Sequence, residues 1–176
     1  MEATDDLSIA PQSQNYHCDG HLLKKLIHAA LVWLDQNHQH VNRLNIFPVP
    51  DGDTGTNMLL TMREAYARIA DSDESHAGNV AAAVAFGALN GARGNSGTIL
   101  SQLWQGAADV LKDHEVLDAA LLAEACRRAV EMAYRAVSAP VEGTILTVSR
   151  EAAEAVTRRV ERGERDLVAL LKVMLF

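Results

Sequence analysis

The chain of 176 residues has 48% apolar but only 5% aromatic residues, a composition that favours one all-α domain with a core of Leu, Val, Ile and Ala. Its 23 acidic and 16 basic residues give a formal net charge of −7, without the interleaved basic and aromatic residues that bind DNA or RNA, so nucleic acid is excluded as a ligand. No apolar run approaches the ~20 residues that span a membrane, and the two cysteines, Cys18 and Cys126, are typical of reduced thiols in a cytoplasmic protein.

Residues 1–19 are polar, show no sustained period and lack the basic-then-apolar order of a signal peptide. We therefore expect a poorly ordered leader without a function. Residues 21–38 differ, because their apolar side chains recur on one helical stripe and predict the first core helix. We expect this helix to end near His38 and His40, whose imidazoles suit a helix C-terminus and are assigned no chemistry. The stripe consists of Leu22, Leu23, Leu26, Ile27, Ala30, Leu31 and Leu34.

The next stretch, LNIFPVPDGDTGTNM at residues 44–58, concentrates prolines, glycines and acids between two helical patterns. Its prolines restrict the backbone and predict a stiff strap that leads to the acids. Asp51 and Asp53 flank a glycine, and this spacing lets both carboxylates turn toward one cation. Residues 54–57 precede an apolar pattern that begins at Met58, so the N–H groups of a helix start would face the same point. Taken alone, the motif is also ordinary turn and N-cap chemistry, and most such pentapeptides bind nothing.

Two more helices and a second glycine-rich turn follow. Residues 58–69 carry one apolar face, and residues 77–89 are rich in alanine, which permits close helix approach until Gly91 ends the pattern. The turn GARGNSG at residues 91–97 then opens a fourth helix, whose apolar face extends over residues 99–111. Two helix starts that can bind anions in one domain indicate a nucleotide as the ligand.

The C-terminal third predicts three helices. Asp118 is a cap for a fifth helix that breaks near Pro140, Thr144 starts a sixth that ends at Gly163, and residues 166–176 form a seventh. No alternating or β-branched run typical of a strand occurs anywhere. We therefore predict an all-α bundle of seven helices, with short connections that favour antiparallel neighbours.

Three strings in this order resemble the nucleotide-binding domain shared by bacterial fatty acid kinase and the L subunit of dihydroxyacetone kinase: LNIFPVPDGDTGTNM, GARGNSGTILSQ and PVEGTILTV. The first string is closest to fatty acid kinase. The resemblance covers residues 20–176 and implies an antiparallel barrel of eight helices with the nucleotide at one open end. Since periodicity predicts only seven, the chain looks like a truncated or excised domain that lacks the last helix.

The resemblance also implies a site. It assigns Asp51 and Asp53 to two magnesium ions that bridge the phosphates of ATP or ADP. Dihydroxyacetone kinases carry a third metal-binding aspartate shortly before this pair, whereas this chain has Asn45 there, as fatty acid kinases do. Glu142 is interpreted either as a site residue or as a capping acid. The implied nucleotide contacts are Thr54, Gly55, Thr56 and Asn57 in the first turn, Gly94, Asn95, Ser96 and Gly97 in the second, and Thr144 and Ile145 beside the adenine.

The sequence offers no catalytic residue beyond the metal ligands, because it contains no nucleophile–base pair and no Walker-type lysine motif. The resemblance implies that another domain or protein presents the phosphoryl acceptor: a fatty-acid-binding protein for fatty acid kinase, or a K subunit carrying the triose for dihydroxyacetone kinase. We expect an ATP-dependent kinase domain most like fatty acid kinase. A dihydroxyacetone kinase L subunit and an inactive scaffold remain alternatives. A bundle with an uncovered apolar stripe is also expected to form homodimers.

Overall fold

The computed structural model describes residues 16–45 and 50–175. Within these residues the chain is all-α, and one isolated antiparallel bridge, between Cys18 and Leu117, is the only strand-like pairing. The predicted all-α class with seven helices is confirmed. The helices are α1 (Gly20–Leu44), α2 (Thr54–Ala67), α3 (Ala77–Gly91), α4 (Gly94–Leu111), α5 (Ala119–Arg135), α6 (Ile145–Glu161) and α7 (Leu167–Val173).

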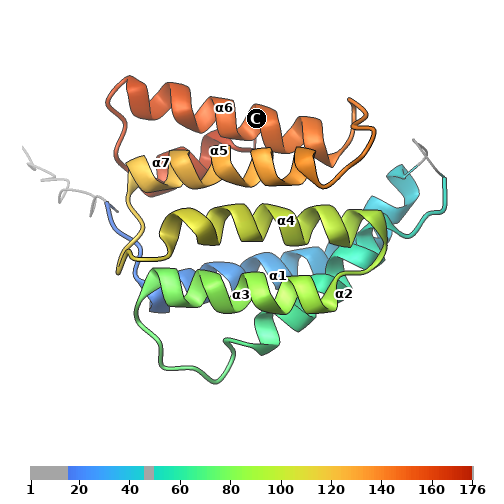
Figure 1. The fold of residues 1–176 in the computed structure, drawn as a ribbon, viewed down its shortest axis with the longest axis horizontal. Coiled ribbons are helices and arrows are strands. Elements are labelled where there is room, and N and C mark those ends of the chain that lie inside the picture. Colours follow the sequence, from blue (N-terminus) through green and yellow to red (C-terminus); the bar gives the residue numbers. More distant parts are fainter. Residues whose placement is uncertain (1–15, 46–49, 176) are drawn as a thin grey trace, which may run out of the picture.

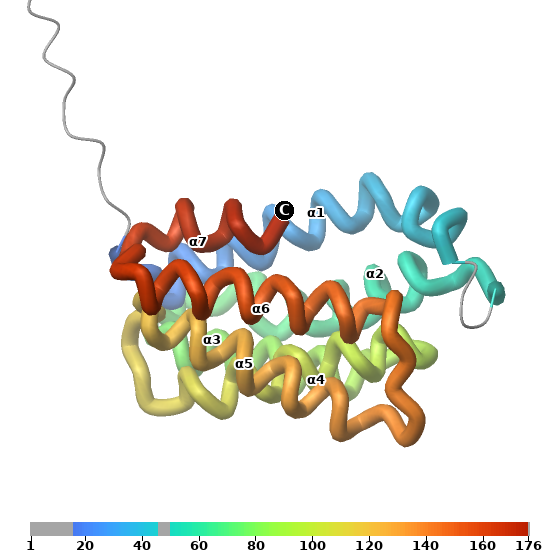
Figure 2. The backbone as a smooth tube through the Cα atoms, turned by 90° about the horizontal axis from the view of Figure 1, so that it is seen from above, coloured from blue at the N-terminus to red at the C-terminus, as the bar shows by residue number. Residues whose placement is uncertain are grey.

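The helices run up and down in one bundle, and each packs against the next along the chain (Figures 1 and 2). α2 also packs on α4, and α1 on α3. Because the direction alternates, α2, α4 and α6 all begin at the same end of the bundle, where α1, α3 and α5 finish. Figure 1 shows this end on the right, together with the loop after α1 and the turn before α6.

Small residues let the central helices approach closely. An added Cβ at Gly87 of α3 would lie 2.8 Å from Cα of Ala65 in α2, and one at Gly106 of α4 would lie 2.5 Å from Cα of Ala129 in α5. At these two crossings the helices therefore pack backbone against backbone, because glycine has no side chain to separate them. Trp104 of α4 packs against the core, as expected, and its Nε1 lies 3.2 Å from a methionine sulfur of α2.

Among the helix boundaries that differ from the prediction, two adjoin the acidic motif. α1 continues past His38 and His40 to Leu44, because neither histidines nor asparagines break a helix, and the C-cap is Asn45. α2 begins at Thr54, four residues before the apolar pattern, and its N-cap is Asp53. Both shifts lengthen helices into the acidic motif and bring the end of α1 beside the start of α2.

The last residues of the expected leader have defined places in the fold. The N–H of Cys18 donates to the carbonyl of Leu117 at 2.8 Å, the N–H of Leu117 donates back at 2.8 Å, and the Cys18 side chain is buried. Burial, with the nearby Asp19 carboxylate, raises the pKa of the Cys18 thiol to about 11. Asp19 caps α1 by accepting from the N–H of Leu22 at 2.8 Å. In the part of the chain that the structure describes, no helix is both long and apolar enough to cross a membrane.

Candidate functional site

The three motifs singled out in the sequence meet at one end of the bundle. The loop after α1 carries the acids, the first turns of α2 and α4 carry the glycine-rich strings, and Thr144 and Ile145 stand at the start of α6 (Figures 1 and 2). The up-and-down order therefore gathers residues from distant parts of the sequence. The predicted strap at Phe47, Pro48 and Val49 lies outside the described residues.

The starts of α2 and α4 differ from the other helix starts among residues 16–45 and 50–175. The N-cap residues of α2 and α4, Asp53 and Arg93, accept no N–H through their side chains. α3 also lacks a side-chain cap, but its first N–H groups donate to the carbonyls of His114 and Glu115 at 3.0 and 2.8 Å. The remaining four helices are capped by side chains, namely those of Asp19, Asp118, Thr144 and Asp166. Uncapped N–H groups at a helix start carry partial positive charge and favour an anion.

The sequence did not single out Asn42, which holds the start of α2 to the end of α1. Its Oδ1 accepts from the N–H of Thr56 at 3.1 Å, and its Nδ2 lies 2.8 Å from Oγ1 of the same threonine. Thr56 is therefore engaged within the protein, and the N–H groups of Thr54 and Gly55 are the first-turn donors without an acceptor in the described residues. An added Cβ at Gly55 would collide with the carbonyl oxygen of His38, so this glycine is required for packing on α1.

The loop between α1 and α2 carries Asn45, Asp51 and Asp53. Nδ2 of Asn45 donates to Oδ1 of Asp51 at 2.6 Å, which joins two of the three residues assigned to metal. Gly52 has φ +66°, a left-handed conformation that suits glycine between the two acids. Both aspartates are exposed, and the carboxylate of Asp53 makes no capping hydrogen bond.

The donor set fits magnesium that is shared with a polyphosphate. No group of three His, Cys, Asp or Glu side chains gathers as a metal cage within the described ranges. Magnesium in phosphate-binding proteins is commonly held by one or two carboxylates together with phosphate oxygens and water. Asp51 and Asp53 supply two such carboxylates beside two uncapped helix starts. The amide of Asn45 can add a neutral oxygen once its side chain turns over.

The first turn of α4 is packed onto α2. Ser96 is buried and its Oγ lies 3.3 Å from the carbonyl oxygen of Thr54, so its hydroxyl is already engaged. An added Cβ at Gly97 would collide with Oγ1 of Thr61, and one at Gly94, where φ is +56°, would collide with the side chain of Asn57. The absence of a side chain at these glycines thus serves the contact between α2 and α4, in addition to the nucleotide contacts that the resemblance implies for Gly94 and Gly97.

Thr61 is a second residue that the sequence did not single out. Its hydroxyl donates to the carbonyl of Asn57 at 2.8 Å and accepts from the N–H of Arg93 at 3.2 Å, and the side chain is fully buried. It therefore ties the N-cap of α4 to the first turn of α2. The N–H groups of Gly94, Asn95 and Ser96 have no acceptor within the described residues.

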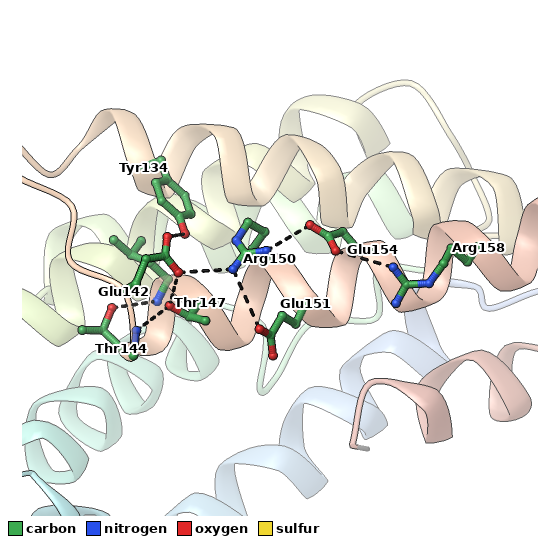
Figure 3. A network of polar contacts seen from close by, with 10 residues as sticks. Tyr134, Glu142, Thr144, Thr147, Arg150, Glu151, Glu154 and Arg158 are labelled. Carbon is green, nitrogen blue, oxygen red and sulfur yellow. Dashed lines mark hydrogen bonds and ion pairs between the residues drawn. The ribbon is translucent and has the colours of Figure 1, made fainter.

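The start of α6 is chemically different. Oγ1 of Thr144 accepts from the N–H of Leu146 at 3.3 Å and donates to the carbonyl of Val141 at 2.8 Å (Figure 3). Its first turn is therefore already capped, and the neighbouring Ile145 is half-buried and apolar. This start suits a neutral, flat part of a ligand better than a phosphate.

A family model described as DAK2 domain matches residues 48–175. The chain belongs to this family. Protein YloV of Bacillus subtilis (strain 168) is 44% identical over 153 residues, which are 87% of this DAK2 chain and 28% of YloV. Uncharacterised proteins of Staphylococcus saprophyticus and Staphylococcus aureus (strain USA300) are 41% and 40% identical over 157 residues, 89% of this chain and 28% of each relative. The chain thus spans less than a third of the length of these relatives.

DAK2 domains are helical, dihydroxyacetone-kinase-like domains that bind ADP or ATP and belong to kinase systems, where they generally work with partner subunits. Membership confirms the predicted resemblance at the level of the family, together with its fold and its nucleotide-binding character. The names of the relatives state no activity.

Proposed function

We propose that the chain is the nucleotide- and magnesium-binding domain of an ATP-dependent phosphotransferase, most like the N-terminal domain of fatty acid kinase. One observation carries this proposal: the starts of α2 and α4 keep first-turn N–H groups without an acceptor in the described residues, and they lie at the same end of the bundle as the exposed carboxylates of Asp51 and Asp53. Uncapped N–H groups attract phosphate oxygens, and the carboxylates attract the cation that accompanies them.

In this proposal the donor is held by three groups of residues. Asp51 and Asp53, with the amide oxygen of Asn45, would hold up to two Mg²⁺ ions, which when bound neutralise the charge of the β- and γ-phosphates. The free N–H groups of residues 54–55 and 94–96 would hold the phosphate oxygens. Thr144 and Ile145 would border the adenine. Thr56, Asn57 and Gly97, which the resemblance also assigns to the nucleotide, additionally make contacts between helices that would support these donors.

The phosphoryl acceptor would come from outside this domain. The sequence contains no nucleophile–base pair and no Walker-type lysine motif, and His38 and His40 near the end of α1 are assigned no chemistry. Alignment of donor and acceptor supplies most of the rate in phosphoryl transfer, so a partner must present the acceptor in line. Asn45 and the proline strap favour a fatty acid on a fatty-acid-binding protein. A triose on a K subunit is the alternative, and an inactive scaffold is the third.

Calorimetric titration of the chain with MgADP, supported by thermal shift, tests the proposal. Bound ligand stabilises the folded state by mass action, so saturating MgADP should raise Tm. Asp53→Ala should abolish magnesium-dependent binding with little loss of stability, because its carboxylate is exposed and makes no cap. Asp113→Ala is the matched control, since Asp113 is an exposed aspartate at the other end of the bundle.

Equal MgADP affinity in the wild type, Asp53→Ala and Asp113→Ala would contradict the proposed site. No binding by the wild type at millimolar MgADP would favour the scaffold. If the chain binds MgADP, the acceptor is identified by an ADP-release assay with ATP. The assay compares a fatty-acid-loaded binding protein with a dihydroxyacetone-loaded K subunit, and the one that stimulates ADP release carries the acceptor.

A further inference from the structure

A polar network centred on Glu142 holds the turn between α5 and α6, residues 136–144 (Figure 3). Oε1 of Glu142 accepts from the hydroxyl of Tyr134, in the last turn of α5, at 3.0 Å. Its Oε2 accepts from Oγ1 of Thr147 at 2.6 Å and from Nη2 of Arg150 at 3.2 Å, both in α6. One carboxylate thus connects the end of one helix, the turn and the start of the next.

The same network determines the shape of the turn. Oγ1 of Thr147 also accepts from the N–H of Gly143 at 2.8 Å, and Gly143 has φ +81° with no atom within 4 Å of a Cβ placed on it. The left-handed residue is therefore held by a hydrogen bond and not by packing. The pKa of Glu142 is lowered by hydrogen bonds from Thr147, Tyr134 and Arg150, so the carboxylate is ionised at neutral pH.

The supply of free N–H groups distinguishes this turn from the other two elements at the same end. The starts of α2 and α4 offer free N–H groups, whereas the start of α6 is capped and has the Glu142 carboxylate beside it. A polyphosphate can therefore accept hydrogen bonds from the first two starts and finds no free donor at the third. What α6 offers is apolar: Ile145 is half-buried, and Val141 is 37% exposed. The end is therefore polarised, with a phosphate side and a nucleoside side.

We propose that Glu142 is a positioning residue that latches the turn at residues 136–144, so that Thr144 and Ile145 form the nucleoside side of the site. This rests on the proposed function as a nucleotide-binding domain. Glu142 acts through the turn and touches no ligand. Exposed ion pairs add little to global stability, so the latch affects the population of one turn conformation and leaves the fold intact.

The expected effect on affinity follows from that population. The apparent Kd equals the intrinsic Kd divided by the fraction of molecules whose turn is in the binding conformation. If loss of the latch leaves roughly 10–20% of the molecules in that conformation, affinity for a nucleotide falls about 5–10-fold. A ligand without a nucleoside makes no use of the turn, and its affinity should stay within about twofold of the wild-type value.

The experiment compares Glu142→Ala with Glu154→Ala in the full chain, using calorimetry with MgADP and with magnesium tripolyphosphate. Glu154 is the matched control, because it pairs with Nη1 of Arg150 at 3.2 Å and with Arg158 at 3.5 Å, but lies in α6 and makes no bond to the turn. Glu142→Ala should lose MgADP affinity about 5–10-fold and keep tripolyphosphate affinity, while Glu154→Ala should change neither. Tyr134→Phe, which removes one hydrogen bond of the latch, should give the same ligand-selective loss at a smaller size and serves if Glu142→Ala folds poorly.

Three results would overturn the latch: wild-type MgADP affinity in Glu142→Ala, an equal loss for tripolyphosphate, or the same nucleotide-selective loss in Glu154→Ala. Failure of the proposed function is distinguishable, because the wild type itself would then bind neither MgADP nor magnesium tripolyphosphate.

Discussion

Asn42→Ala tests whether the first turn of α2 is held in place by the end of α1. The substitution removes two half-buried hydrogen bonds to Thr56, at 2.8 and 3.1 Å. Each is worth about 0.5–1.5 kcal/mol, so we expect the free energy of unfolding to fall by about 1–2 kcal/mol. For a chain of this length the corresponding fall in Tm is about 3–6 °C.

Asn37→Ala is the matched control, because Asn37 lies in the same helix and its amide bonds only the carbonyl of Trp33 one turn earlier. Alanine raises helix propensity equally at both positions, so the difference between the two variants isolates the contacts with Thr56. Urea denaturation of the two proteins supplies the measurement. If Asn42→Ala proves as stable as Asn37→Ala, the amide does not hold the start of α2.

Asn42→Asp separates stability from binding. A carboxylate still accepts from the N–H of Thr56. Its negative charge is favourable at the start of α2 and unfavourable at the end of α1, where residue 42 lies, so these two effects oppose each other and Tm should fall less than in Asn42→Ala. The same charge competes with phosphate for the start of α2. We expect MgADP affinity to fall about 2–5-fold, which corresponds to the ~0.3–1 kcal/mol of a charge at a helix terminus. Unchanged affinity would show that phosphate does not bind at this helix start.

Three further predictions concern other parts of the molecule. In urea denaturation, Gly97→Val should lower the free energy of unfolding by about 1–3 kcal/mol, because a side chain at Gly97 overlaps Thr61 in α2. Ser96→Ala should lower it by only ~1 kcal/mol. Equal losses in the two variants would contradict this packing. The chain alone should release little ADP in a coupled assay until an acceptor-presenting partner is added. Separately, its exposed Trp33 should favour dimers, which light scattering would detect. The folded-state pKa of Glu142 lies below its ordinary value of 4.5. Any stability advantage of the wild type over Glu142→Ala should therefore be present at pH 7 and lost as pH falls through and below 4.5. Thermal melts of both proteins at several pH values supply the measurement.

Periodicity predicted the number and order of the helices because each buries an apolar stripe, and a stripe is visible in the sequence without knowledge of what it packs against. The helix ends were harder. Thr54, Gly55 and Thr56 have weak helix propensity and no apolar period, yet they form the first turn of α2, since Gly55 packs on the backbone of α1 and Asn42 caps Thr56. Such ends depend on tertiary contacts, which a local pattern does not contain.

The candidate site shows the same division. Turn chemistry pointed to Asp51, Asp53 and the two glycine-rich starts, because acids and glycines stand there directly before apolar helical patterns. Asn42 and Thr61 were not singled out, because each acts through a partner far along the chain, Thr56 in one case and Arg93 in the other. An asparagine or a threonine inside a helical pattern is common, and only the contact distinguishes these two.

The two ends of the bundle differ in how their helix-start N–H groups are hydrogen-bonded, and they should therefore differ in hydrogen exchange. At the end away from the acids, the segment after α4 binds the first N–H groups of α3 and pairs Leu117 with Cys18, so amide protons there exchange with solvent only when helices separate. At the other end, the amide protons of residues 94–96 have no acceptor in the described structure and are open to exchange while the bundle stays intact. Hydrogen exchange at residues 94–96 should therefore report ligand binding, whereas exchange at the opposite end of the seven described helices should report separation of the helices.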